Sequence, residues 1–316
     1  MSQLQTLRDA LSSVVVVPVT PFAADKSADF DTYAKLCTRL VDAGISVLTP
    51  NGNTGEFYAL TAEEAQRATE AAVQAANASS ANASSASSSG GEAQVLVGVG
   101  HDIGTAIKAA QHAQQSGAGM IMIHQPVHPY VSTEGWIDYH AEIANAVPEL
   151  GVVLYIRNER ITGATIAALA DRAPNVIGIK YGLRDATVFA RVSRDAGLDR
   201  FTWLAGAAEL TAPPFWAAGA RGFTSGLANV APSLSLELLN ALKSNDFETA
   251  MKVWESVRRF EELRLANASA DNVSVVKEGL AQLGLCRADV RPPSRPLPQA
   301  VKDEISGILA SWGLSR

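Results

Sequence analysis

Short apolar runs recur along the chain and are separated by segments whose apolar residues have helical spacing. Continuous apolar runs, unlike alternating ones, are typical of parallel strands that are covered on both faces. The expected strands are Val14–Val19, Ile45–Thr49, Val95–Val99, Met120–His124, Val152–Ile156, Val176–Lys180, Thr202–Ala205 and Gly222–Ser225. Helical spacing is clearest between them in residues 29–44, 104–119 and 162–175. The chain therefore alternates strand and helix.

This alternation predicts a closed (β/α)₈ barrel, because each parallel strand needs a crossover helix before the next strand. An open doubly wound sheet is the alternative. The number of strands and the lack of a G-x-G-x-x-G motif after any strand favour the barrel. Residues 1–13 predict an amphipathic helix ahead of the first strand.

Two regions depart from the alternation. Residues 77–91 are rich in Ser, Ala, Asn and Gly without a hydrophobic pattern, which predicts a flexible surface insertion on the barrel face opposite the active site. After the last strand the pattern is purely helical, in residues 233–268, 272–285 and 298–313. We therefore expect the barrel in residues 1–232, and its last helix with a carboxy-terminal helical appendage in residues 233–316.

Composition narrows the class of protein. The 316 residues are 47% hydrophobic and 18% charged, with a formal net charge of −6, which argues against a nucleic-acid binder. The two cysteines, Cys37 and Cys286, make neither a disulfide framework nor a C-x-x-C metal site. Residues 1–13 lack the basic segment and long apolar core of a signal peptide, so none is expected there, and no run approaches the roughly 18 apolar residues of a membrane span. A soluble cytoplasmic protein is expected, with no membrane partner.

Chemistry is expected at the carboxyl ends of the strands, where the active sites of such barrels lie. Lys180 ends the sixth strand and Tyr155 lies at the end of the fifth. Desolvation favours the neutral amine of a lysine, which attacks ketones, and a neighbouring phenol can move protons. The alternatives are that Lys180 reaches solvent or pairs with Glu56 or Asp185, and that Tyr155 is a core aromatic residue.

Other strand ends supply polar groups to which the sequence assigns no catalytic step. The loop TPNGNTGEF (49–57) offers hydroxyl, amide and backbone N–H groups around glycines, a suitable cradle for a carboxylate. Glu56 in this loop is expected to brace it by accepting backbone hydrogen bonds. His101 and His124 lack metal-ligand spacing, so no metal is expected. For Arg264 and Lys277 two alternatives remain: each is either a solvated residue on its helix or a residue that faces the pocket mouth.

Several of these segments resemble the superfamily of dihydrodipicolinate synthase and N-acetylneuraminate lyase. They are GNTGEFYALTAEE (52–64), LYIR around Tyr155, VIGIKYG around Lys180, LAGAAE (204–209) and GFTSGLANVAP (222–232). The resemblance extends from about residue 8 to 313. It implies a (β/α)₈ barrel with carboxy-terminal helices, a homotetramer, and a 2-keto acid bound as a Schiff base with no metal or organic cofactor.

The resemblance also implies roles for individual residues. Lys180 is expected to form the Schiff base, and Tyr155 to be the acid/base phenol. Thr54 is expected to hold the keto-acid carboxylate. The complete set of expected substrate-binding residues is Asn53, Thr54, Gly55, His128, Tyr130, Gly206 and Ser225.

The departures from the family pattern concern the substrate. Asn53 stands where the first threonine of the G-T-T-G-E loop belongs to a proton relay, and an amide cannot relay protons in that way. His128, with Tyr130 two residues on, takes the place of the relay tyrosine that a neighbouring subunit supplies. Arg160 or Arg157 is expected to replace the arginine at the pocket mouth. These changes disfavour dihydrodipicolinate synthesis. The segment GEFYAL, the altered loop after Tyr155 and the segment TSGLANVAP instead resemble the 5-dehydro-4-deoxyglucarate dehydratase branch.

The primary hypothesis is therefore a lyase that cleaves or condenses a C–C bond of a pyruvate-type or 2-keto-3-deoxy sugar acid through a lysine Schiff base. A sugar-acid dehydratase is the alternative within the enzyme class. The alternative of another class is a keto-acid-binding barrel without turnover. Asn53 and His128 favour that last interpretation, whereas the pairing of Lys180 with Tyr155 argues against it.

Overall fold

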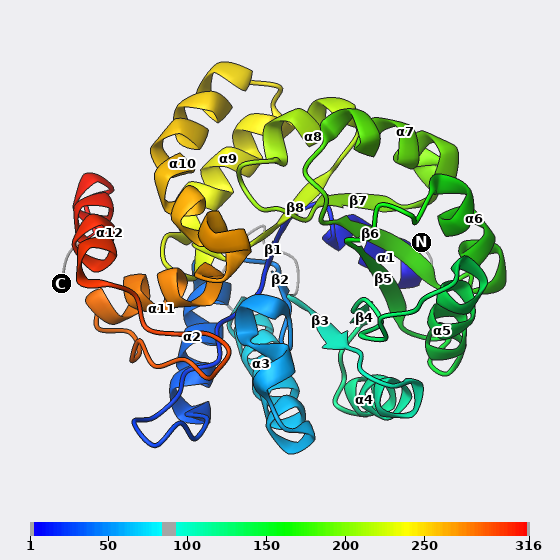
Figure 1. Cartoon of the computed structure of the whole chain (residues 1–316), viewed down its shortest axis with the longest axis horizontal. Coiled ribbons are helices and arrows are strands. Elements are labelled where there is room, and N and C mark those ends of the chain that lie inside the picture. The colour runs from blue at the N-terminus through cyan, green and yellow to red at the C-terminus, as the bar shows by residue number, and fades with distance from the viewer. Residues whose placement is uncertain (1–2, 84–92, 315–316) are drawn as a thin grey trace.

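The strands of the chain close into a barrel. The computed structural model describes residues 3–83 and 93–314 (Figure 1). Within them eight parallel strands pair in chain order, and the first also pairs with the last. The strands are β1 Val14–Val16, β2 Val47–Leu48, β3 Gln94–Val99, β4 Met120–Ile123, β5 Gly151–Ile156, β6 Val176–Tyr181, β7 Thr202–Ala205 and β8 Gly222–Ser225. Each overlaps its predicted run, so the (β/α)₈ barrel is confirmed and the open sheet is wrong.

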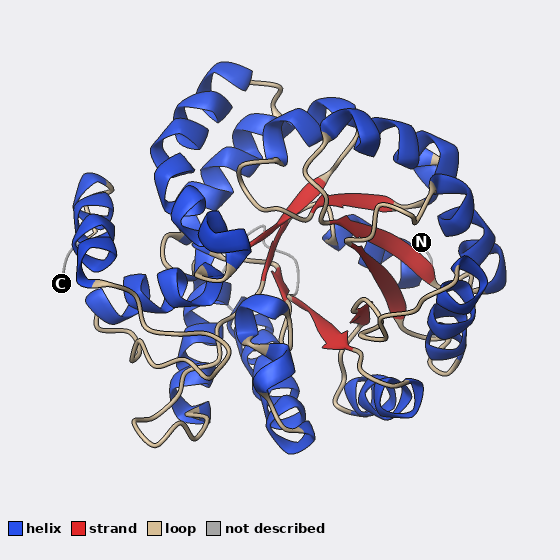
Figure 2. Cartoon of the chain, in the orientation of Figure 1, coloured by secondary structure: helices blue, strands red, loops and turns tan. Residues whose placement is uncertain are grey.

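Helices surround the strands on the outside (Figure 2). The connecting helices are α2 Phe30–Asp42, α3 Ala62–Ala83, α4 Ile103–Gln115, α5 Thr133–Asn145, α6 Gly163–Arg172, α7 Ala186–Ala196, α8 Ala212–Ala218 and α9 Pro232–Lys243. Several begin at a side chain that accepts a backbone N–H of the first turn, as Asp102 does for α4 and Asp185 for α7. Such caps end the loops that carry the functional residues and limit their freedom.

The predicted amino-terminal helix, α1 Gln3–Ala10, is confirmed, and it closes the bottom of the barrel. Leu7 and the following Leu11 pack among the side chains that fill the barrel interior. These interior side chains are Val15, Val47, Leu96, Met120, Met122, Val153, Tyr155, Ile177 and Leu204. Because apolar packing fills the amino-terminal end, a cavity inside the barrel can open at the carboxyl ends of the strands.

The predicted insertion at residues 77–91 is wrong in its first part. Helix α3 continues to Ala83, so residues 77–83 are helical. Alanine has the highest helix propensity, and this stretch alternates alanine with small polar residues that a surface helix tolerates. Residues 84–91 of the predicted insertion lie outside the described residues.

The carboxy-terminal helices follow α9 as α10 Phe247–Ser269, α11 Asn272–Gln282 and α12 Gln299–Ser311. The helical pattern expected in residues 233–268 is confirmed and comprises two helices, α9 and α10, of which Asp246 caps the second. Helix α10 is interrupted near its end, where Ala266, Asn267 and Ala268 have non-helical backbone angles. Helix α11 contacts the loops that follow β2 and β8, so the appendage reaches the active-site end. The proposed boundary at residues 232 and 233 stays a prediction.

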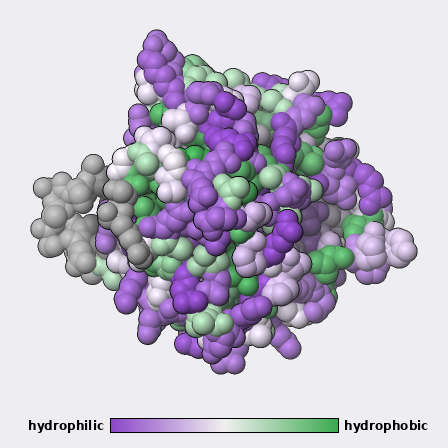
Figure 3. All heavy atoms as spheres, turned by 60° about the vertical axis from the view of Figure 1, so that its left-hand side comes forward, coloured by the Kyte–Doolittle hydropathy of each residue, from purple (hydrophilic) through white to green (hydrophobic). Residues whose placement is uncertain are grey.

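The surface over these helices is mainly hydrophilic. Figure 3 brings the left-hand side of Figure 1 forward, and hydrophobic residues appear there only in small patches between hydrophilic ones. Among the residues that the structure describes, no helix is long and apolar enough to cross a bilayer.

Candidate active site

A cavity of about 200 Å³ lies at the carboxyl ends of the strands. Six of the nine predicted site residues line it, namely Asn53, Thr54, Tyr155, Lys180, Gly206 and Ser225. They come from the loop after β2 and from the ends of β5, β6, β7 and β8. The barrel thus brings together residues that lie as much as 172 positions apart in the sequence (225 − 53).

Lys180 lies deep in this cavity beside Tyr155. The two residues are register partners on β5 and β6, and Lys180 Nζ is 4.2 Å from the centre of the Tyr155 ring. Lys180 is only 5% exposed. Burial, together with the positive charges of Arg157 and Arg264, lowers its pKa to about 7. A large fraction of Lys180 is therefore the neutral, nucleophilic amine at neutral pH.

The alternatives in which Lys180 extends into solvent or pairs with Glu56 or Asp185 are wrong. The side chain is 5% exposed and lines the cavity, and among the described residues its Nζ takes part in no hydrogen bond or ion pair. Glu56 bonds to Lys277 instead, and Asp185 caps α7. The sixth strand therefore carries, one residue before its end, a buried lysine without a carboxylate partner among the described residues.

Tyr155 lies among hydrogen-bond donors. Burial raises the pKa of its phenol, while the charge of Arg157 and hydrogen bonds from Asn53 and Arg157 lower it. The Oδ1 atom of Asn53 has no partner among the described residues, as expected if its NH₂ group faces Tyr155. Asn53 thus stabilises the phenolate but cannot pass a proton onward.

The loop that carries Asn53 and Thr54 is held by the appendage. Glu56, which adopts a left-handed conformation (φ 60°), ends its 3₁₀ turn Asn53–Gly55. Its carboxylate accepts a bond from Lys277 Nζ at 2.6 Å and one from the backbone N–H of Arg291 at 2.9 Å. The prediction that Glu56 braces the loop by accepting backbone hydrogen bonds is confirmed. Both alternatives for Lys277 are wrong, because it is fully buried in this ion pair.

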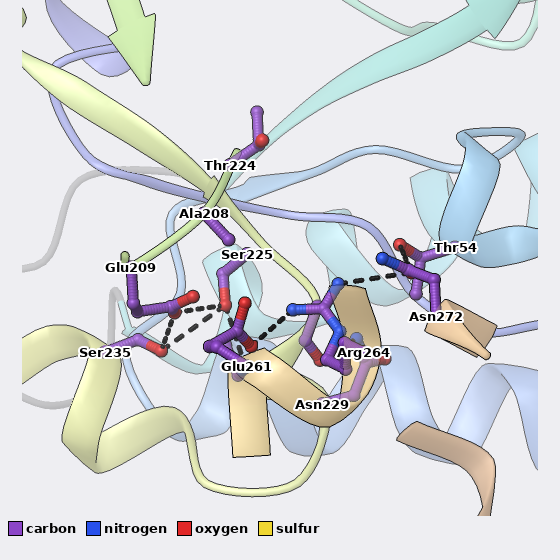
Figure 4. A network of polar contacts seen from close by, with 12 residues as sticks. Thr54, Ala208, Glu209, Thr224, Ser225, Asn229, Ser235, Glu261, Arg264 and Asn272 are labelled. Carbon is purple, nitrogen blue, oxygen red and sulfur yellow. Dashed lines mark hydrogen bonds and ion pairs between the residues drawn. The ribbon is translucent and has the colours of Figure 1, made fainter. Parts of the chain in front are cut away.

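A polar network extends from the residues that line the cavity into the structure behind them, and Figure 4 shows its contacts. Ser225 and Ser235 each donate to Glu209 at 2.6 Å. Arg264 contacts Glu261 at 2.5 Å and Asn272 Oδ1 at 3.3 Å, and Thr54 Oγ1 lies 3.4 Å from that same oxygen. Burial, with the charge of Glu261, raises the pKa of Glu209 to about 7. Arg264 therefore faces the cavity, which was one of its two predicted places.

Sequence reasoning missed three members of the cavity wall, which are Arg184, Glu261 and Asn272, and it missed Glu209, which lies behind Ser225. Glu261 and Arg264 carry a weak signal, because they are charged residues on the apolar face of a helix. Arg184 and Asn272 carry no local signal.

The structure does not bring three predicted substrate-binding residues to the cavity wall. Gly55 lies behind it, and its carbonyl accepts a bond from Thr20. His128 and Tyr130 lie in the exposed loop after β4, with Tyr130 86% exposed. Arg160 is also exposed and bonds to the carbonyl of Val131, whereas Arg157 lines the cavity. Of the two arginines considered, Arg157 thus has the better position.

The two histidines at strand ends belong to an aromatic cluster. His101 and His124 both stack on Phe57. Burial lowers the pKa of His124 to about 3, and its Nε2 lies 2.8 Å from the carbonyl of Asn51. Over residues 3–83 and 93–314, no cluster of three or more acidic, histidine or cysteine side chains could hold a metal ion.

The cavity carries more positive than negative groups. Arg157, Arg184, Arg264 and Lys180 line it, and Glu261 is the one carboxylate in its wall within the described part of the chain. Since Glu261 is paired with Arg264, the remaining charge is positive. Such a pocket attracts an anionic ligand.

Comparisons with known proteins match this chain to one family over nearly its whole length. The family model for the dihydrodipicolinate synthetase family matches residues 10–311. A 5-dehydro-4-deoxyglucarate dehydratase from Pseudomonas putida is 30% identical over 316 residues, covering 98% of each chain. The crystal structure of a dihydrodipicolinate synthase from Oceanobacillus iheyensis matches with a TM-score of 0.90 at 35% identity, over 98% of this chain and 99% of that one. A prophage protein of the dihydrodipicolinic acid synthase family from E. coli K12, in complex with pyruvate, matches with a TM-score of 0.82 at 27% identity, over 95% and 99%.

Proposed function

From the premise that the chain belongs to the dihydrodipicolinate synthetase family and is a lyase, we propose that Lys180 forms a Schiff base with a 2-keto acid. The observation that carries this proposal is the buried amine of Lys180, unpaired among the described residues and 4.2 Å from the Tyr155 ring. A lysine with a pKa of about 7 is a nucleophile at neutral pH, and the imine that it forms stabilises negative charge on the adjacent carbon.

The reaction that we propose first is the elimination of water from a 2-keto-3-deoxy sugar acid. The Lys180 amine attacks the ketone and a water leaves, giving the imine. Tyr155 takes a proton from C3, and the resulting enamine expels the C4 hydroxyl, which leaves as water with the proton that Tyr155 returns. Hydrolysis of the conjugated imine frees Lys180, so the net change is the loss of one water.

Two observations favour elimination. The 5-dehydro-4-deoxyglucarate dehydratase from Pseudomonas putida covers 98% of this chain. Asn53 bonds to Tyr155 without a hydroxyl that could relay a proton, and elimination needs no relay because Tyr155 recycles the proton. Aldol cleavage or condensation is the second candidate. It is favoured by the 35% identity to a protein described as a dihydrodipicolinate synthase.

Anionic groups of the substrate have two places to bind. The Thr54 hydroxyl and the N–H groups of its loop are suited to the carboxylate beside the ketone. Arg157 and Arg184 lie on the loops that follow β5 and β6, are exposed, and line the cavity. We propose that they receive a second acidic group at the far end of the substrate.

Borohydride trapping tests the Schiff base. The protein is incubated with pyruvate, and separately with a 2-keto-3-deoxy sugar acid, then reduced and mapped by mass spectrometry. We expect an adduct on Lys180 that is absent in Lys180→Ala, and a fall in turnover on the order of 10⁴-fold or more in that variant. Lys252→Ala, at an exposed lysine, serves as the matched control. An unmodified Lys180 with both compounds would overturn the proposal.

The products separate the remaining possibilities. Elimination yields an unsaturated or rearranged keto acid without pyruvate, whereas aldol cleavage releases pyruvate and an aldehyde. A Lys180 adduct without turnover of any sugar acid would instead identify a keto-acid-binding barrel.

We also propose a homotetramer in the cytoplasm. Val127 and Tyr130, in the loop after β4, are large exposed hydrophobic side chains and support a contact of that loop with a neighbouring subunit. Light scattering after size-exclusion chromatography should give about four times the chain mass of 33.2 kDa. A mass of one chain would contradict the tetramer.

A further inference from the structure

We infer that the buried ion pair of Glu261 and Arg264 is the receptor for a hydroxyl group of the substrate, beyond its keto-acid end. This inference rests on the proposed function, because it assigns the far part of a substrate whose ketone reacts at Lys180. Neither residue belongs to the eight strands or their loops, since both lie on α10 of the carboxy-terminal appendage.

The pair is built into the wall of the cavity. Glu261 is 1% exposed and Arg264 is 4% exposed, yet both line the same cavity as Lys180. Gly226, just after β8, leaves the space that the guanidinium occupies. A Cβ atom at position 226 would lie 2.2 Å from Arg264 Nη2, so a larger residue there would displace it. The close approach of Arg264 to the cavity therefore depends on α10, which carries it, and on the small residue Gly226 in the loop after β8.

The guanidinium keeps donors that no described residue uses. Of its N–H groups, one on Nη1 bonds to Glu261 and one on Nη2 bonds to Asn272. Nε is buried and has no partner among the described residues. Arginine has five N–H donors, so one N–H on Nη1 and one on Nη2 are also unused by the described residues. Nε has almost no accessible surface, so a ligand in the cavity is a suitable partner for these two Nη donors and not for Nε.

The chemistry of the pair suits a hydroxyl group better than a carboxylate. Glu261 offsets the charge of Arg264, so the pair is close to neutral, and a buried carboxylate would meet repulsion from Glu261. Arg264 donates and Glu261 accepts, and a hydroxyl group can both accept and donate. A carboxylate is better served by Arg157 and Arg184, which line the cavity without an acidic partner in residues 3–83 and 93–314.

A purely structural role is the competing explanation. Arg264 and Thr54 both contact Asn272 Oδ1, at 3.3 and 3.4 Å, so Arg264 could act only by holding Thr54 in place (Figure 4). In that case its loss would weaken every keto acid equally. A hydroxyl receptor instead distinguishes hydroxylated keto acids from pyruvate, which has no hydroxyl group.

The test is the ratio of trapping efficiencies for two compounds. Reduced adduct on Lys180 is measured against concentration for a 2-keto-3-deoxy sugar acid and for pyruvate, in wild type, Arg264→Met and Glu261→Gln. We expect the ratio of sugar acid to pyruvate to fall roughly 10- to 100-fold in Arg264→Met, the range for a hydrogen bond to a charged group. Using the ratio cancels any effect of Arg264 on the Lys180 amine, since both compounds react with it.

Two other results for the trapping efficiencies of Arg264→Met would overturn the inference. A ratio that stays the same while both efficiencies fall identifies Arg264 as a brace for Thr54, and unchanged efficiencies show that the pair does not meet the substrate. If Arg264→Met does not fold, judged by circular dichroism, Glu261→Gln decides by the same ratio because it preserves the side-chain volume. Failure of wild-type Lys180 to trap either compound would instead contradict the proposed function.

Discussion

Two lysines are buried at the active-site end of this barrel, and their surroundings differ in one respect. Lys180 is 5% exposed and Lys277 is 0% exposed, each lies over an aromatic ring, and burial lowers the pKa of both. Lys277 has a carboxylate 2.6 Å away in Glu56, which raises its pKa against the effect of burial. Lys180 has no such partner in the described structure, and its charged neighbours are arginines.

This difference separates a structural lysine from a reactive one. An ammonium that is paired and hydrogen-bonded stays protonated, and it holds the loop of Asn53 and Thr54 against α11. An unpaired buried amine loses its proton readily and becomes a nucleophile. Burial alone therefore does not distinguish a catalytic lysine, whereas burial without a carboxylate partner beside a phenol is the arrangement on which the proposed role of Lys180 rests.

Replacing the structural lysine should have the largest effect on stability. Lys277→Met leaves Glu56 buried without its cation, and we expect unfolding in urea to require about 3–5 kcal/mol less free energy. The matched control is Lys252→Met, which removes an exposed lysine paired with Glu248 and should change stability by about 0–1 kcal/mol. Equal losses in the two variants would show that the Glu56 pair is not structural. Borohydride should still modify Lys180 in both.

Replacing the reactive lysine should stabilise the fold. The native pKa of Lys180 is about 7, below the ordinary lysine value of 10.5, so between these values the unfolded chain binds more protons. Wild-type stability therefore increases with pH across that window. Below the window the native state buries a charged ammonium, and the full free-energy cost of burying that charge applies. We expect Lys180→Met to be more stable than wild type by about 1–3 kcal/mol at pH 6, with a smaller gain near pH 10.

Thermal unfolding of both proteins over that pH range measures this gain. A Lys180→Met variant less stable than wild type at pH 6 would mean that the lysine has a partner in solution. Lys277→Met, examined over the same range, should remain less stable than wild type throughout.

The smallest effect is on the pH dependence of the reaction. The rate of adduct formation with pyruvate should rise with pH through about 7 as Lys180 loses its proton, falling about tenfold per pH unit below that value. Arg157→Gln should move this limb to higher pH, because Arg157 is the charged neighbour that lowers the pKa most. A Glu209→Gln variant is the control, since the pKa of Glu209 is also near 7. A limb that moves in Glu209→Gln and not in Arg157→Gln would contradict the assignment to Lys180.

The barrel and the two principal site residues could be predicted because their signals are local. Continuous apolar runs marked all eight strands, and parallel pairing places Tyr155 beside Lys180 at adjacent strand ends. The error in the secondary structure was local as well, because residues 77–83 are helical and alanine favours helix.

The remaining walls of the site could not be predicted, because their contacts join distant segments. Thr54 meets Asn272 across 218 positions, and Glu56 meets Lys277 across 221. Lys277 was expected to be solvated or at the pocket mouth, because nothing in its own helix indicates a buried carboxylate opposite it. The exposed positions of His128 and Tyr130 likewise follow from the course of one loop after β4.

By itself, the sequence determined the order of strands and helices, the end of the barrel that carries the chemistry, and the two residues at its centre. Hydrophobic periodicity is a property of consecutive residues, and parallel pairing converts it into position. Tertiary structure alone decided which buried lysine is paired and which is left reactive. The pKa of a buried amine depends on the charges within a few ångströms of it, and those belong to segments that only folding brings together.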